Sequence, residues 1–88
     1  MKEGSWIQRL SIQDETLPGQ TLVEILEDQR VLIEHHRGIT QYSREHIQIR
    51  VKFGAICVSG EGLSLCRMTA NQLVITGRID SLTLLRGN

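Results

Sequence analysis

Aromatic residues are nearly absent from this chain of 88 residues, which contains one Trp, one Tyr and one Phe. Because proteins usually hold single-stranded nucleic acid on stacked aromatic side chains, this scarcity argues against such a ligand. The formal net charge is zero, so no field of the whole protein attracts nucleic acid or an anionic membrane. Ile, Leu and Val must fill the interior, and we expect no nucleic-acid partner.

Long apolar runs are missing as well. The longest is far shorter than the ~18–20 residues that cross a bilayer, and no segment resembles a signal peptide. The two cysteines are therefore predicted to be free thiols in a reducing cytoplasm. The one proline, Pro18, precedes Gly19 and marks a turn. We predict a single domain, residues 1–88. The turn divides it into an N-terminal helix and linker, residues 1–20, and a β-domain, residues 21–86.

The charges are unevenly spread along the chain. Residues 1–34 carry three cations and seven anions, a net charge of −4, whereas residues 35–88 carry seven cations and three anions, a net charge of +4. The two halves either complement each other within one fold or favour head-to-tail association into a homo-oligomer. We favour the first interpretation, because charge asymmetry alone does not specify a partner.

Residues 4–12 predict a short N-terminal helix with Ser5 as its cap. Its apolar face holds Trp6, Ile7 and Leu10. Such a helix is too short to be stable alone in water, so this face must dock on the sheet, on a partner or on a membrane. We favour the sheet, because Lys2 and Arg9 alone would attract lipid only weakly.

Strand patterns dominate the chain after residue 20. Residues 46–53 alternate strictly, with Ile47, Ile49, Val51 and Phe53 on one face, which is the period of a half-buried strand. Earlier strands are predicted at residues 21–26 and 30–36, joined by a two-residue turn that pairs Glu27 with Arg30.

Turns are predicted at residues 60–62 and 68–71, and the apolar alternation slips between Ile79 and Leu82, which indicates a bulge. Together, the strand and turn patterns predict an all-β fold. The expected form is a small antiparallel meander or roll of about six to eight short strands with the N-terminal helix. Residues 56–60 resemble residues 73–77, so a small β-solenoid is the alternative.

The stretch from His35 to Tyr42 holds the most distinctive residues. Gly38 is placed where a sharp bend needs a positive φ angle. Neighbouring histidines in a strand face opposite sides, so His35 and His36 cannot chelate one ion together. The chain also lacks the ligand spacing of common zinc sites. We expect no metal and no cofactor.

Cys57 and Cys66 are predicted to be neighbours. If residues 61–62 form a hairpin turn, Val58 pairs with Leu65 and the two cysteines pair on the opposite face. The thiols would then pack side by side as free thiols. Neither has an activating base or helix terminus beside it in the sequence, and no serine lies in a nucleophile elbow. We therefore expect no enzyme activity.

Arginine makes up most of the positive charge, and it suits carboxylate recognition better than lysine. Arg50 and Lys52 share one strand face, which is either a binding strip for an acidic partner or a solvated face. The candidate contact surface consists of Arg37, Gly38, Tyr42, Arg50 and Lys52. Free strand edges beside it would allow pairing with a partner or between subunits.

Residues 34–42, EHHRGITQY, resemble the E-N-H-R-G-I-x-x-Y segment of the YabP/YqfC family of sporulation proteins. The departure is His35, where relatives are expected to have Asn. Further segments follow the order and spacing of that family, and the resemblance spans residues 5–86 and is closer to YqfC than to YabP. These segments are residues 47–51, 54–60, 63–65 and 73–79.

The resemblance implies a protein made during endospore formation, in the cytoplasm of the mother cell. It supplies no catalytic residues, so it favours a structural or interaction role with protein partners of the sporulation machinery. The alternative is a peripheral membrane adaptor that recruits a sporulation membrane protein, with the face of Trp6, Ile7 and Leu10 as its contact.

Overall fold

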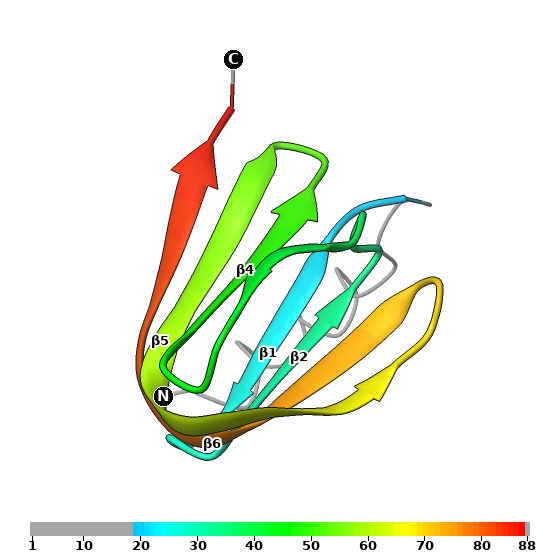
Figure 1. Ribbon diagram of the computed structural model, residues 1–88. Helices are drawn as coiled ribbons and strands as arrows, with labels where there is room; N and C mark the ends of the chain where they lie inside the picture. Colours follow the sequence, from blue (N-terminus) through cyan, green and yellow to red (C-terminus); the bar gives the residue numbers. More distant parts are fainter. Residues whose placement is uncertain (1–18, 88) are drawn as a thin grey trace, which may run out of the picture.

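The computed structural model describes residues 19–87, which form six β-strands and no helix (Figure 1). The strands are β1 (Leu22–Leu26), β2 (Arg30–Glu34), β3 (Ile39–Tyr42), β4 (His46–Val51), β5 (Gly54–Met68) and β6 (Gln72–Arg86). They form one sheet in the order β1-β2-β6-β5-β4-β3, and every pairing is antiparallel. The all-β prediction is confirmed, and the sheet is not the alternative solenoid. The predicted helix at residues 4–12 lies outside the described residues.

Strands β5 and β6 are each 15 residues long and bend together, which folds the sheet over on itself into two layers (Figure 1). One layer holds β1, β2, the first half of β6 and the second half of β5. The other layer holds β3, β4 and the remaining halves of the two long strands. The bend therefore creates the interior of the domain between two halves of a single sheet.

Glycines allow the close approach of the two backbones at this bend. A Cβ atom on Gly60 would lie 1.8 Å from the carbonyl oxygen of Arg78, and one on Gly77 would lie 2.6 Å from that of Gly62. Gly77 also has a φ of +132°, which side chains disfavour. Gly60 and Gly77 end the two segments that look alike in the sequence. Their likeness reflects one shared bend rather than a repeated unit.

The predicted hairpin turn at residues 61–62 is wrong. Strand β5 continues through these residues, and Val58 pairs with Leu82 instead of Leu65. A Gly-x-Gly sequence lets the chain either reverse or bend. Here the long antiparallel partner β6 follows β5 on both sides of the glycines, so the chain bends.

The turn between β1 and β2 is also one residue longer than predicted. Leu26, not Glu27, lies opposite Arg30, so the predicted Glu27–Arg30 pair does not form. Glu27 takes a positive φ of 50° in the turn. Two other predictions are confirmed. Residues 69–71 form the predicted turn, which connects β5 to β6. Ser59 pairs with Ser81 but Gly60 pairs with Ile79, so Asp80 forms the predicted bulge.

Within residues 19–87, the hydrophobic core between the layers is aliphatic, as the composition requires. It consists of Val31, Ile33, Ile47, Ile49, Val51, Ile56, Val58, Leu63, Leu73, Ile75 and Ile79. The predicted alternation in β4 is thereby confirmed for its three apolar residues. Phe53 departs from it, because β4 ends at Val51 and Phe53 lies in the following turn with 38% of its surface exposed.

Candidate functional site

The connection between β2 and β3 lies against β4. The Arg37 N–H donates to the Arg50 carbonyl at 2.7 Å, and the Arg50 N–H donates to the Gly38 carbonyl at 2.8 Å. Gly38 has a φ of +107°, so the predicted need for glycine at this bend is confirmed. These two backbone bonds make Arg37 a fixed neighbour of Arg50.

His36 holds this connection to the other layer. Its Nε2 lies 2.9 Å from the Thr69 carbonyl oxygen, and its Nδ1 accepts the Gly38 N–H at 3.0 Å. These partners assign the neutral imidazole with its proton on Nε2. Only 8% of His36 is exposed, so the ring acts as a buried link between the bend at Gly38 and the β5–β6 turn.

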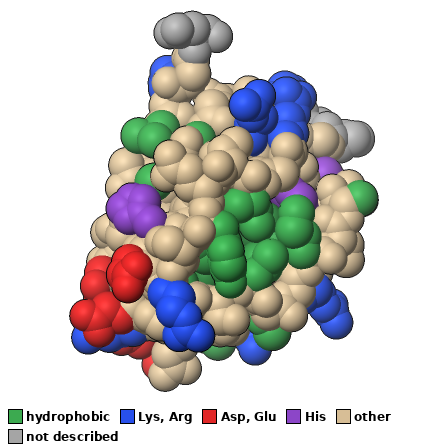
Figure 2. Space-filling model, viewed as in Figure 1, with side chains coloured by type: hydrophobic (Ala, Val, Ile, Leu, Met, Phe, Trp, Pro, Cys, Tyr) green, Lys and Arg blue, Asp and Glu red, His purple; other side chains and the backbone are tan. Residues whose placement is uncertain are grey.

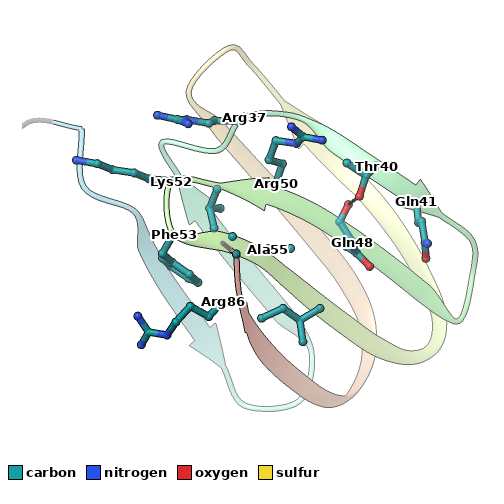
Figure 3. A pocket seen from close by; sticks show the side chains of 13 residues that line it. Arg37, Thr40, Gln41, Gln48, Arg50, Lys52, Phe53, Ala55 and Arg86 are labelled. Atoms are coloured by element: carbon teal, nitrogen blue, oxygen red, sulfur yellow. Dashed lines mark hydrogen bonds between the residues drawn. The ribbon is translucent and has the colours of Figure 1, made fainter.

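The outer face beside this connection is hollowed into a groove of about 580 Å³ (Figure 3). The small residues Gly54 and Ala55 of β5 leave this space open, next to Val51 and Arg50 of β4. The lining residues are Arg37, Thr40, Gln41, Gln48, Arg50, Val51, Lys52, Phe53, Gly54, Ala55, Leu85, Arg86 and Gly87. We call this hollow the basic groove.

Among the described residues, four cations line the basic groove and no carboxylate does. Arg37 comes from the β2–β3 connection, Arg50 from β4, Lys52 from the β4–β5 turn and Arg86 from the end of β6. Figure 3 shows Arg37 and Lys52 extending from the same end of the groove. The arrangement gives a region of positive potential on a protein whose total charge is zero.

The opposite end of the molecule is charged differently. Figure 2 shows acidic side chains gathered near the bend of the long strands and a group of Lys and Arg side chains at the other end. Near the bend, Arg78 forms ion pairs with Glu61 at 3.3 Å and Asp80 at 3.1 Å. The hydrogen bond to Asp80, followed by its charge and that of Glu61, raises the pKa of Arg78.

Within residues 19–87, none of the four groove cations takes part in an ion pair. An exposed cation without a protein counter-charge is available to an external anion. Arginine adds a planar fork of donors that matches a carboxylate in two parallel hydrogen bonds. The groove can therefore bind an anionic group through several donors at once.

The structure brings together part of the predicted contact surface. Arg37, Arg50 and Lys52 line the groove, and Gly38 shapes the loop behind it. Tyr42 lies elsewhere: its hydroxyl oxygen accepts the Leu65 N–H at 3.4 Å between the two layers.

Sequence reasoning missed Arg86, the fourth groove cation. Arg86 lies 34 positions after Lys52 in the sequence and reaches the groove because β5 and β6 pair Gly54 with Arg86. The only sequence signal for this placement is the apolar pattern that continues to the end of β6. That pattern indicates a strand, but it does not give the register.

The predicted pair of adjacent thiols does not form, because it depended on the hairpin at residues 61–62. Cys57 lies opposite Gln48 and Thr83, and its Sγ is 3.8 Å from the Gln48 Oε1. Cys66 is exposed, farther along the same strand in the other layer. Both thiols are free, and they lie in different layers of the sheet.

The described part of the chain contains no cluster of His, Cys, Asp or Glu that could hold a metal ion. His35 and His36 bond to different segments, with the Nδ1 of His35 2.6 Å from the Gln20 carbonyl oxygen. Residues 19–87 also lack a helix of the length and apolarity that crossing a bilayer requires. Trp6, Ile7 and Leu10, the predicted membrane or partner contact, lie outside this range.

Comparison with known proteins gives one family. The model of the YabP family matches residues 18–88, which is most of the chain and includes all six strands and the basic groove. No curated protein and no solved structure matches the chain. The family match agrees with the resemblance seen in residues 34–42.

Proposed function

Because the chain belongs to the YabP family, we propose that it is a non-catalytic interaction protein of endospore formation. Family membership suggests the sporulation-related role. Within the family we group the chain with the YqfC-like members, following the resemblance of its ordered segments. We place its action in the cytoplasm of the mother cell, the compartment that the resemblance implies.

The basic groove carries the proposal that a protein partner binds here through an acidic segment. Four cations that form no ion pair within residues 19–87 converge from four separate stretches of chain on one shallow surface. An extended segment with several Asp or Glu side chains would meet Arg37, Arg50 and Lys52 in turn. Charge complementarity of this kind gives fast and specific association.

The lining of the groove supports a binding role over a catalytic one. Among the described residues it contains no His, Cys, Asp or Glu, which are common general bases and nucleophiles. Its neutral polar groups include the side chains of Thr40, Gln41 and Gln48. These can hydrogen-bond a peptide backbone.

A direct test measures binding of a fluorescent Glu-rich peptide by anisotropy. We expect binding that weakens as salt rises, because exposed charges are screened over about 8–10 Å at physiological ionic strength. The variant Arg50→Glu/Lys52→Glu should weaken binding at least about tenfold. The matched control is Arg67→Glu, since Arg67 is also an exposed arginine but lies in the other layer.

The cellular test replaces the chromosomal copy by each variant and counts heat-resistant spores. Arg37→Ala and Arg50→Glu/Lys52→Glu should lower the count, and Arg67→Glu should not. An oligonucleotide that competes with the peptide at equal affinity would contradict an acidic protein partner. Concentration-dependent sedimentation that Arg50→Glu abolishes would instead show that the acidic segment belongs to a second copy of this chain.

A further inference from the structure

Three exposed apolar residues lie at one end of the molecule, next to the basic groove, with Leu84 and Leu85 on opposite faces of one strand. Phe53 is 38% exposed, Leu84 60% and Leu85 42%. Phe53 lies in the β4–β5 turn, whereas the two leucines lie near the end of β6. Figure 1 shows this turn and the end of β6 at the same end of the sandwich, away from the bend. We call these three residues the apolar tip.

Contacts between backbone groups hold the β4–β5 turn against the end of β6. Gly54 lies opposite Arg86, and the Gly87 N–H donates to the Phe53 carbonyl at 2.8 Å. A Cβ atom on Gly54 would lie 2.1 Å from the Leu85 carbonyl oxygen, so the glycine permits this close approach. The turn and the strand end therefore form one rigid unit.

The fold does not account for the exposure of these side chains. Leu84 lies opposite Ile56, which is completely buried, yet Leu84 itself is mostly in solvent. Strand β2 pairs with β6 only over the residues from Gln72 to Thr76. Within the described residues, the far half of β6 thus forms the edge of its layer, and no other strand covers its last leucines.

Cations surround the apolar tip. Phe53 and Arg86 line both the basic groove and a second hollow of about 260 Å³ that also includes Leu84. Lys52 precedes Phe53 directly, and Arg50 lines the groove behind it. Of residues 19–87, no carboxylate lines either hollow. Apolar side chains at a chain turn with long cations beside them are typical of a surface that contacts lipid.

We propose that the apolar tip inserts into the headgroup region of an anionic bilayer, with Lys52 and Arg86 contacting the lipid headgroups. A bilayer fits better than an apolar protein partner because, among the described residues, the charged side chains beside the tip are all cations. The contact shares Phe53, Lys52 and Arg86 with the basic groove and adds Leu84, which does not line the groove.

Vesicle flotation with the protein tagged at its N-terminus tests the contact, because a C-terminal tag would sit beside the tip. We expect the protein to float with vesicles of phosphatidylcholine and about 30% phosphatidylglycerol, and not with phosphatidylcholine alone. Each cation near an anionic surface contributes about a fivefold increase in binding. Salt at about 0.5 M should release the protein, because it shortens the range of the attraction to a few ångströms.

Leu84→Ser is the key variant, and Leu26→Ser is its matched control. The two leucines are 60% and 58% exposed, but Leu26 lies beside the β1–β2 turn, near the bend. Leu84→Ser should lower vesicle binding at least about tenfold, because serine cannot make the apolar contact that leucine makes inside the bilayer. Leu26→Ser should leave it unchanged, and both variants should keep their melting temperature.

Three results would overturn the proposal. The first is no flotation with anionic vesicles at low salt, and the second is equal flotation with neutral vesicles. The third is equal loss in Leu84→Ser and Leu26→Ser. Binding of the Glu-rich peptide, measured on the same Leu84→Ser protein, should persist. Its loss would mean that Leu84 supports the groove itself, which would overturn the assignment of Leu84 to a lipid contact.

Discussion

Replacing Gly60 by Ala tests whether the bend of the two long strands depends on close backbone approach. Gly60 is buried, and its added Cβ would lie 1.8 Å from the Arg78 carbonyl oxygen. Ordinary contacts of this kind are longer than about 3 Å, so one backbone must move by more than ~1 Å. Gly60 has no positive φ angle, so the expected strain comes from the contact and not from the residue's own conformation.

The expected cost is at least about 3 kcal/mol of unfolding free energy, the upper range for forcing extra atoms into a packed site. Domains of this size have ~5–10 kcal/mol in total. In urea, where about 1 kcal/mol per molar is typical for a small protein, the midpoint should fall by about 3 M. Melting should occur about 12–24 °C lower, from about 4–8 °C per kcal/mol.

Gly62→Ala is the control for this experiment, because Gly62 has a φ of +63° but nothing within 4 Å of its added Cβ. It should cost only the ~1–2 kcal/mol of a left-handed conformation. Urea unfolding of both variants, followed by circular dichroism, ranks the two effects. Equal midpoints, or a smaller loss for Gly60→Ala, would refute the idea that backbone contact across the bend limits position 60.

Three further predictions concern single side chains. His36→Ala should destabilise the fold by about 1–3 kcal/mol in urea unfolding, because two partly buried backbone groups lose their partner. Ile49→Ala should cost about 2–5 kcal/mol by the same measurement, because Ile49 is completely buried. Mild oxidation should form no disulfide between Cys57 and Cys66, and a thiol assay should still count two, because bridging needs Cα atoms within about 7 Å and the two cysteines lie in different layers, with Cys57 opposite Gln48 and Thr83.

Much of the fold follows from local patterns in the sequence. The alternation in β4 identifies Ile47, Ile49 and Val51 as core residues, and the slip before Leu82 marks the Asp80 bulge. These features depend on neighbours in the chain, so periodicity is enough to find them. The bend at residues 60–62 is different. The same glycines permit a reversal or a bend, and the choice depends on Gly77 and Arg78 in the partner strand.

The candidate site shows the same division between local and long-range information. Arg50 and Lys52 could be placed on one surface from spacing alone, since they lie two residues apart. Arg37 could be added only through the bend at Gly38, and Arg86 could not be found, because its position depends on the β5–β6 register. The alternation extends to Phe53 although β4 ends at Val51, because alternation cannot show where a strand ends.

The distribution of charge argues that the groove cations do more than keep the protein soluble. Solubility is best served by interspersed charges of both signs, and the region near the bend has this arrangement, with Arg78 between Glu61 and Asp80. Among the described residues, the charged side chains of the basic groove are all cations, although placing like charges together costs stability through repulsion. Selection for a ligand on this outer face would account for both the clustering and the missing carboxylates.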